Sequence, residues 1–273
     1  MQLVFQSHFS TIVKTNDYKE LLADSYYVST KHEATGHIQA NIDDFIIAKA
    51  NWDVYRSPQF NEIDNADVNH LIGQEAYLNV GPALNEAFGS VGAFPKELIA
   101  ECIRGIIQAE TYLYNKRGFE SPENYENAWK SMYLNSCRYY SHLDRVVNKW
   151  HEHVGKLDRL DYLFHRNKTC SIIDNNEKNL LVTGYFSDSF HQMGVVMGLT
   201  DGVIVSCTGN LLRAPDKVCF ETGTYLTGLV GLKVNELKKK EASKIIGGSQ
   251  GCSHLVDIVS EMVRSIHFFN QVD

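Results

Sequence analysis

The sequence repeats a set of landmarks at a nearly constant separation, and this internal repeat limits the folds that the chain can adopt. The paired landmarks are Asp44 and Asp201, Arg56 and Arg213, Pro58 and Pro215, and Gly73 and Gly231. The first three pairs are 157 positions apart, and the fourth pair is 158 apart. Self-similarity at a fixed distance is the signature of a repeated structural unit. We therefore predict two tandem copies of one unit.

Each copy begins with extended segments and ends with helices. In the second copy Leu255, Val259 and Met262 recur at helical spacing. Runs of strands followed by helices are typical of α+β proteins. The predicted fold class is α+β, with two tandem repeats of an antiparallel β-sheet that carries two helices on one face, joined by a long helix. The predicted domains are residues 1–112 and 161–273, with a connecting helical segment over 113–160.

The connecting segment carries a heptad pattern. Ser121-Pro122-Glu123 is a good helix start, with a cap residue, a proline at the first position and an acid in the first turn. Apolar and aromatic residues then recur every seven positions, at Tyr133, Tyr140, Val147 and Val154. Such a stripe is typical of a coiled-coil seam or of a helix that packs along the protein's own domains. We expect a long helix over 121–157 and keep a homodimer through it open.

Composition narrows the class of protein. The chain has 273 residues and a formal net charge of −7, which argues against non-specific nucleic-acid binding. No stretch approaches the ~20 apolar residues that a membrane span needs, and the first residues lack the features of a signal peptide. The six cysteines have no short paired spacing, so we expect neither a disulfide framework nor a Cys-x2-Cys zinc module. We expect a cytoplasmic protein without nucleic-acid or membrane partners.

The residues best suited to chemistry lie in the second copy. The glycine-rich stretch 247–251 leads to Cys252 at the start of a helix, where free N–H groups favour a thiolate. Cys219 lies in the first turn after Pro215. Thiolate, imidazole and carboxylate are the ligands of zinc and, with more sulfur, of iron–sulfur clusters. The predicted metal site comprises Asp188, His191, Cys219, Cys252 and His254. The alternative is that both cysteines are small core residues, because each extends an apolar stripe.

The first copy lacks this set of residues. At the separation of 157, the positions of Asp188, Cys219 and Cys252 are taken by Lys31, Glu62 and Pro95. We therefore predict that the site belongs to the second copy only. Arg56 and Arg213 occur in both copies, which favours a structural role at the corner between strand and helix.

Two resemblances bear on function. Arg213-x-Pro215-x3-Cys219 and the stretch 251–255 (Gly-Cys-Ser-His-Leu) resemble a bacterial domain-of-unknown-function family over roughly residues 162–268. More distantly, the order of elements is similar to iron–sulfur scaffold proteins of the NifU N-terminal and SufE type. In that family three cysteines and an aspartate hold zinc or an assembling cluster. Cys252 matches its last cysteine, Asp188 lies near its Gly-Asp loop, and Cys219 lies one turn after its middle cysteine. The resemblance implies a scaffold or carrier.

Two other functions remain open, and enzymatic activity is undecided. A small-molecule-binding protein or enzyme would have its cleft between the copies, lined by the aromatic residues Tyr26, Tyr27, Trp52, Tyr55 and Phe94. A dimeric adaptor would use the heptad helix and would need neither a metal nor a cleft.

Overall fold

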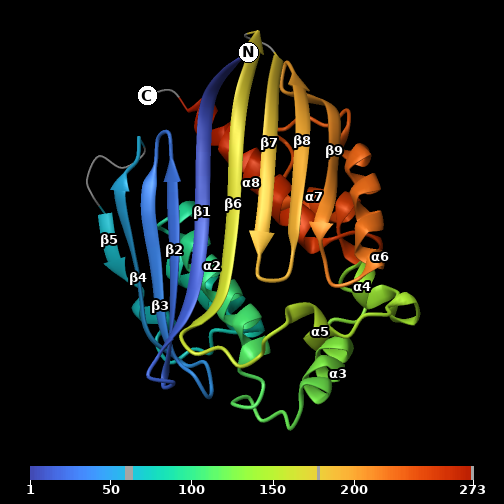
Figure 1. Cartoon of the computed structure of the whole chain (residues 1–273). Helices are drawn as coiled ribbons and strands as arrows, with labels where there is room; N and C mark the ends of the chain where they lie inside the picture. Colours follow the sequence, from blue (N-terminus) through green and yellow to red (C-terminus); the bar gives the residue numbers. More distant parts are fainter. Residues whose placement is uncertain (59–63, 177–178, 272–273) are drawn as a thin grey trace. The chain divides into compact units, whose positions relative to one another are not determined.

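The structure is a computed structural model that describes residues 1–58, 64–176 and 179–271 (Figure 1). The chain divides into two compact units. The C-terminal unit comprises Met1–Ser7, Glu126–Gly155 and Asn167–Asp273, and the N-terminal unit comprises His8–Tyr125 and Lys156–Arg166. The two long strands β1 (Gln2–Asn16) and β6 (Tyr162–Asn176) contribute residues to both units.

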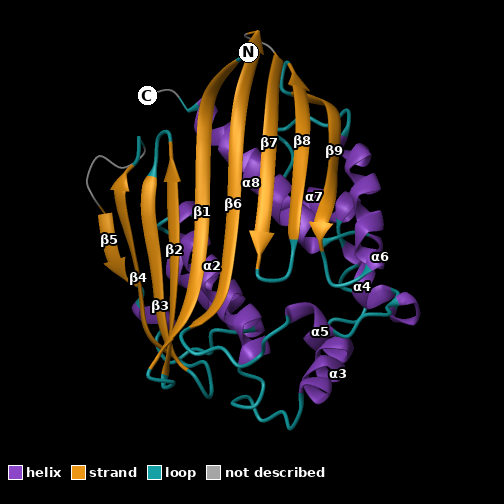
Figure 2. Cartoon of the chain, in the orientation of Figure 1, coloured by secondary structure: helices purple, strands orange, loops and turns teal. Residues whose placement is uncertain are grey.

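The strands form a large antiparallel sheet, hydrogen-bonded in the order β5-β4-β3-β2-β1-β6-β7-β8-β9 (Figure 2). The remaining strands are β2 (Glu20–Ser29), β3 (Glu33–Asn41), β4 (Ile47–Arg56), β5 (Asp64–Asp67), β7 (Asn179–Asp188), β8 (Gln192–Thr200) and β9 (Val203–Arg213). Buried and accessible residues alternate along them, as expected for strands with one face on the core. The predicted combination of antiparallel strands and helices is therefore present.

One long helix packs on the buried face of each unit. In the N-terminal unit α2 (Ala93–Ala109) lies so close to β3 that a Cβ on Gly36 would be 2.8 Å from the Cβ of Leu98. In the C-terminal unit α8 (Ser253–Asn270) crosses β7, where a Cβ on Gly184 would be 2.6 Å from the Met262 sulfur. Each fully buried aliphatic side chain on these helices contributes about 1.5–3 kcal/mol, so helix packing is a main source of stability in both units.

The two units share several details of local structure. The strands β1 and β6 have 15 residues each, β2 and β7 have 10 each, and β3 and β8 have 9 each. The hairpins β3–β4 and β8–β9 each contain two register shifts. Gly73 and Gly231 have φ of 82° and 90°, and their N–H groups donate to Ile47 O and Ile204 O. Both glycines follow the end of a helical turn, as predicted, and positive φ suits glycine there.

Other helices differ from the prediction. The C-terminal unit has α6 (Lys217–Phe220) and then a 3-10 helix (Glu221–Leu229) before Gly231, with α7 (Lys239–Ile246) further on. At the equivalent place the described part of the N-terminal unit has β5 and a short 3-10 turn, with α1 (Gly81–Phe88) after Gly73. The Asp-Asn-Ala-Asp sequence of β5 favours helix weakly, and the segment instead pairs with β4. Among the described residues no helix is both long and apolar enough to cross a membrane.

The predicted long connecting helix is not formed. The segment folds as α3 (Pro122–Met132), α4 (Arg138–Ser141) and α5 (Trp150–Val154). The chain leaves the helix after Met132 and reaches a left-handed conformation at Asn135, with φ of 64°. Tyr133 and Tyr140, seven positions apart, stack with ring centroids 5.6 Å apart across this turn. The heptad spacing therefore marks a folded-back turn and provides no continuous seam for a dimer.

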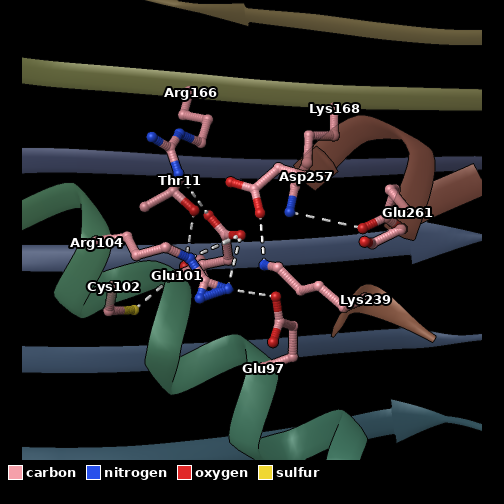
Figure 3. A network of polar contacts seen from close by, with 12 residues as sticks. Thr11, Glu97, Glu101, Cys102, Arg104, Arg166, Lys168, Lys239, Asp257 and Glu261 are labelled. Carbon is pink, nitrogen blue, oxygen red and sulfur yellow. Dashed lines mark hydrogen bonds and ion pairs between the residues drawn. The ribbon is translucent and has the colours of Figure 1, made fainter. Parts of the chain in front are cut away.

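Each unit buries an ion pair beneath its long helix (Figure 3). In the N-terminal unit Glu101 of α2 lies 3.5 Å from Arg166 and 3.2 Å from Arg104. In the C-terminal unit Glu261 of α8 lies 3.6 Å from Lys168 and also pairs with Arg264. A buried charge is tolerated only when it is paired and hydrogen-bonded, so each glutamate constrains the position of its helix on the sheet.

Candidate metal site

Three polar side chains of the C-terminal unit converge on one point. Asp188 ends β7, His191 immediately precedes β8, and His254 is the second residue of α8. One ligand atom from each lies within 4.8 Å of the other two. The Asp188 Oδ1–His191 Nδ1 distance is 3.2 Å, and the Asp188 Oδ2–His254 Nε2 distance is 3.9 Å. The Asp188 side chain is fully buried, whereas the His191 and His254 side chains are 11% and 17% exposed, so the group is partly open to solvent on its histidine side.

The turn between β7 and β8 orients two of these residues. Asp188 Oδ1 accepts the backbone N–H groups of Phe190 and His191, at 2.8 Å and 2.6 Å, which is an Asx turn. Arg213 Nη2 donates to the carbonyl oxygens of Asp188 and His191, at 2.6 Å and 3.2 Å. Arg213 thus has the structural role predicted for it. With Oδ1 held in the turn, the Oδ2 of Asp188 faces His254.

His153 supports the same turn from α5. Its Nε2 donates to the carbonyl oxygen of Phe190 at 2.8 Å. Burial, together with the nearby His191 and Arg213, lowers the pKa of His153. The Phe190 ring packs against Trp150, with centroids 4.8 Å apart. No sequence motif indicates this role, because the partner of His153 is a backbone carbonyl 37 residues away.

His254 is oriented by Cys252 and by aromatic packing. Cys252 is the residue that immediately precedes α8, and its Sγ lies 3.9 Å from His254 Nδ1. The imidazole also stacks on that of His191, with centroids 3.9 Å apart, and packs against Phe186. His254 therefore presents Nε2 to Asp188 and Nδ1 to sulfur. Such an outer partner fixes the tautomer and the orientation of a metal-binding imidazole.

The cysteines differ from the prediction in their acidity. Burial raises the pKa of Cys252 to about 12, although backbone N–H groups of Leu255 and His254 lower it. Burial likewise raises the pKa of Cys219 to about 12. The expectation of a helix-start thiolate is therefore wrong for the protein without a metal. The loss of water around the sulfur outweighs the hydrogen bonds and the helix potential.

Cys219 and Cys252 are not members of the converging group. Among the described residues, the group whose ligand atoms lie within 4.8 Å of one another comprises Asp188, His191 and His254. The charge of Cys252 nevertheless raises the pKa of Cys219, which indicates that the two thiols lie in the same part of the C-terminal unit. Cys137, at the start of α4, raises the pKa of both. Cys137 is not among the predicted ligands, because nothing in its spacing links it to the other two cysteines.

The N-terminal unit contains the same turn with different side chains. Ser29 Oγ accepts the backbone N–H groups of Lys31 and His32, at 3.2 Å and 2.9 Å. Arg56 Nη2 donates to the carbonyl oxygen of Ser29 at 3.1 Å. The ring of Phe94, the second residue of α2, lies 5.7 Å from that of His32. Ser29, His32 and Phe94 thus have the places that Asp188, His191 and His254 have in the C-terminal unit.

This comparison corrects the pairing made at the separation of 157. The turn partner of Asp188 is Ser29 rather than Lys31. The residue that precedes the long helix is Gly92 in α2 and Cys252 in α8, so Pro95 is not the partner of Cys252. Loops of slightly different length shift the separation by two or three residues. Glu62, the predicted partner of Cys219, lies outside the described residues.

The aromatic residues predicted to line a cleft do not share one surface. Tyr27, Trp52 and Phe94 are 0%, 2% and 7% exposed and belong to the core of the N-terminal unit. Tyr26 and Tyr55 are 40% and 50% exposed and lie on the other face of the strands. Neighbouring residues in a strand point to opposite faces, so these five residues cannot line one cleft.

One family model matches the part of the chain that carries the candidate site. No curated protein and no solved structure matches the chain. Residues 164–267 match the model of a family described as "protein of unknown function (DUF2889)". That match extends from β6 into α8 and includes Asp188, His191 and His254.

Proposed function

We propose that Asp188, His191 and His254 bind a single divalent transition-metal ion, zinc or iron(II). The observation that carries the proposal is the convergence of their three ligand atoms, within 4.8 Å, around the buried carboxylate of Asp188. A carboxylate and two imidazoles are a ligand set that zinc and mononuclear iron both accept. The residues come from a strand end, a turn and a helix start, so their meeting depends on the tertiary fold.

The distances suit a tetrahedral ion. Bonds of about 2.0–2.1 Å separate neighbouring ligand atoms of tetrahedral zinc by roughly 3.3 Å. The 3.2 Å distance joins Asp188 Oδ1 to His191, and the 3.9 Å distance joins Asp188 Oδ2 to His254. With one ligand atom from each residue the group converges to within 4.8 Å, so these atoms must approach by up to roughly 1.5 Å to hold a tetrahedral ion. Three protein ligands leave a fourth position for water, which is the arrangement of catalytic rather than structural zinc sites. An enzyme that activates water or polarises a carbonyl group would be consistent with this site.

The N-terminal unit supports the proposal that the three residues serve a function rather than the fold. Ser29 and Phe94 allow the same turn and helix start to form there, so the fold does not itself require a carboxylate or a second imidazole. We propose that the two units descend from one duplicated unit. On this account the ligand set was kept or acquired by the C-terminal unit alone.

A sulfur scaffold or carrier is the second candidate. The effect of Cys137 and Cys252 on the pKa of Cys219 favours it, because it indicates three thiols in one part of the unit, and soft metal ions prefer sulfur ligands. Against it, iron–sulfur clusters are held mainly by thiolates, and the converging group contains none. The pKa values of about 12 at Cys219 and Cys252 also keep both sulfurs protonated unless a metal displaces the protons.

The double variant Asp188→Ser/His254→Phe tests the proposal. It copies the residues that the N-terminal unit uses in the same turn, so we expect it to fold. Zinc affinity is measured by competition with a chromophoric chelator, for the wild type and the variant. Loss of two of three ligands should weaken binding by more than the roughly 10–100-fold typical of outer-partner changes.

A matched control is Ser29→Ala, which alters the equivalent turn of the N-terminal unit and should leave zinc affinity unchanged. The triple variant Cys137→Ser/Cys219→Ser/Cys252→Ser separates the two candidates. It abolishes binding if the thiols hold the metal, and it weakens binding only modestly, through Cys252, if the histidines do. Equal zinc affinity in the wild type and in Asp188→Ser/His254→Phe would refute the proposal.

A further inference from the structure

A chain of four polar side chains crosses three strands of the N-terminal unit. Asp24 Oδ1 lies 2.7 Å from His37 Nδ1, and His37 Nε2 lies 3.1 Å from Thr35 Oγ1. Thr35 Oγ1 lies 3.3 Å from the hydroxyl of Tyr55. Asp24 on β2 and His37 on β3 are direct cross-strand partners. These residues point away from α2, because the alternate residue Gly36 faces Leu98 of that helix.

The hydrogen bonds have a single consistent direction when the imidazole is neutral. An ionised carboxylate only accepts, so Asp24 requires the proton of His37 on Nδ1. Nε2 is then an acceptor, and the hydroxyl of Thr35 donates to it. The oxygen of Thr35 in turn accepts the hydroxyl proton of Tyr55. The order is the one in which a carboxylate orients a histidine so that the histidine acts as a base on a hydroxyl group.

Exposure indicates which hydroxyl meets a reagent. Thr35 is only 8% exposed, whereas Tyr55 is 50% exposed. Tyr26, whose ring meets the edge of His37 with centroids 6.3 Å apart, covers another side of the imidazole. The Asp24 and His37 side chains are themselves 29% and 32% exposed, so Thr35 is the shielded member of the chain and Tyr55 is the more exposed of its two hydroxyl groups.

We propose that Asp24, His37 and Thr35 form a general-base relay that makes Tyr55 a nucleophile toward small acyl electrophiles. The phenol oxygen attacks the acyl carbon, and its proton passes to Thr35 while the Thr35 proton passes to His37 Nε2. The bond from the acyl carbon to the leaving group breaks, and the leaving group receives the proton from His37. The products are an O-acyl Tyr55 and the protonated leaving group. The proposal is independent of the metal site, which shares no residue with this relay.

The C-terminal unit provides an internal reference. Tyr185 on β7 is 56% exposed, which is close to the exposure of Tyr55. Within the described parts of the chain, no hydrogen bond of the Tyr185 hydroxyl is found. Tyr55 and Tyr185 are therefore similarly exposed to solvent, but among the contacts of the described residues only the Tyr55 hydroxyl is hydrogen-bonded, through Thr35, to a histidine.

Acetylation by N-acetylimidazole at neutral pH tests the relay, with each tyrosine quantified by peptide mass spectrometry. In the folded wild-type chain we expect Tyr55 to be acetylated roughly tenfold faster than Tyr185, a modest effect for general-base assistance at a half-exposed site. His37→Gln and Thr35→Val should lower the ratio of the two rates to about one. Thr35→Ser should preserve the ratio, and so should Asp188→Ser/His254→Phe.

The sign of the change separates the relay from a purely structural network. If the four side chains only brace the strands, His37→Gln loosens Tyr55 and raises its acetylation rate. A raised or unchanged ratio in His37→Gln would therefore overturn the proposal, as would a wild-type ratio near one. Should Thr35→Val fail to fold, the comparison of His37→Gln with Thr35→Ser decides the question.

Discussion

His32 lies in the core of the N-terminal unit, against the rings of Tyr27 and Phe94. Burial, together with the charges of Lys31 and Arg56, lowers the pKa of its imidazole from the ordinary 6.5 to about 4. The unfolded chain therefore takes up a proton at a pH where the folded chain does not. This residue makes the stability of the protein depend on pH even though it has no part in the metal site.

The sign of that dependence is determined by the two pKa values. The unfolded state binds more protons than the folded state between pH 6.5 and about 4, so stability decreases as the pH falls through this window. The loss is about 3 kcal/mol over the whole window, at 1.36 kcal/mol per pKa unit. Urea unfolding at pH 7 and pH 4.5 should show that His32→Phe loses less stability than the wild type. An equal loss in both proteins would contradict this assignment.

At the residue scale, the sequence shows which side chains could bind a metal, but it does not show how deeply each side chain is buried or what it contacts. Asp188, His191 and His254 belong to the predicted ligand set of five, chosen for residue type and for their place beside the two helix-start thiols, and these three converge in the structure whereas Cys219 and Cys252 are not in the group. The acidity of Cys252 could not be predicted, because helix-start potential is a local property whereas burial is a property of the tertiary fold. The hydrogen bond from His153 to the carbonyl oxygen of Phe190 could not be predicted either, because a backbone acceptor has no sequence signature.

At the scale of elements, periodicity predicted the long helix of the second copy well and the connecting segment badly. The stripe through Leu255, Val259 and Met262 corresponds to the buried face of α8. The heptad through Tyr133 and Tyr140 instead reflects rings that stack across a turn. A helical stripe and a chance heptad differ in whether their side chains are buried along one continuous face. The spacing of residues in the sequence does not contain that information.

The ion pair beneath α8 leads to a prediction about this element. Glu261→Gln removes the charge that compensates Lys168, which is 3% exposed. Removing one member of a buried ion pair costs about 3–5 kcal/mol, and Glu261 also pairs with Arg264. The exposed pair of Lys233 and Glu236 is the control, because Glu236→Gln should cost at most ~1 kcal/mol. Chemical denaturation measures both changes, and similar small losses would show that the buried pair does not hold α8 in place.

At the scale of the whole molecule, the landmarks in the sequence predict a repeat, and the two units share strand lengths and register shifts, but one fixed separation does not pair their residues correctly. A single separation of 157 matched the landmarks at Arg56 and Arg213, where both arginines hold a turn carbonyl. It failed at Asp188 and Cys252, because loops of different length intervene. Hydrogen bonds of the turn, rather than residue identity, reveal Ser29 as the counterpart of Asp188.

This equivalence predicts that a second site can be installed. Ser29→Asp/Phe94→His would give the N-terminal unit the ligand set of the C-terminal unit, with His32 already present in the turn. We expect the zinc content, measured by elemental analysis after dialysis, to rise from about one to about two ions per chain, given a ligand set suited to zinc. An unchanged stoichiometry in a folded variant would argue against the equivalence of the two turns.

The most direct test of the central claim is the X-ray absorption spectrum of the zinc-loaded protein. A site built from Asp188, His191 and His254 predicts only nitrogen and oxygen neighbours, at about 2.0–2.1 Å, with the outer-shell scattering of two imidazoles. A sulfur shell at about 2.3 Å would instead assign the metal to the cysteines. Such a shell, or the failure of the wild-type protein to retain zinc, would contradict the account.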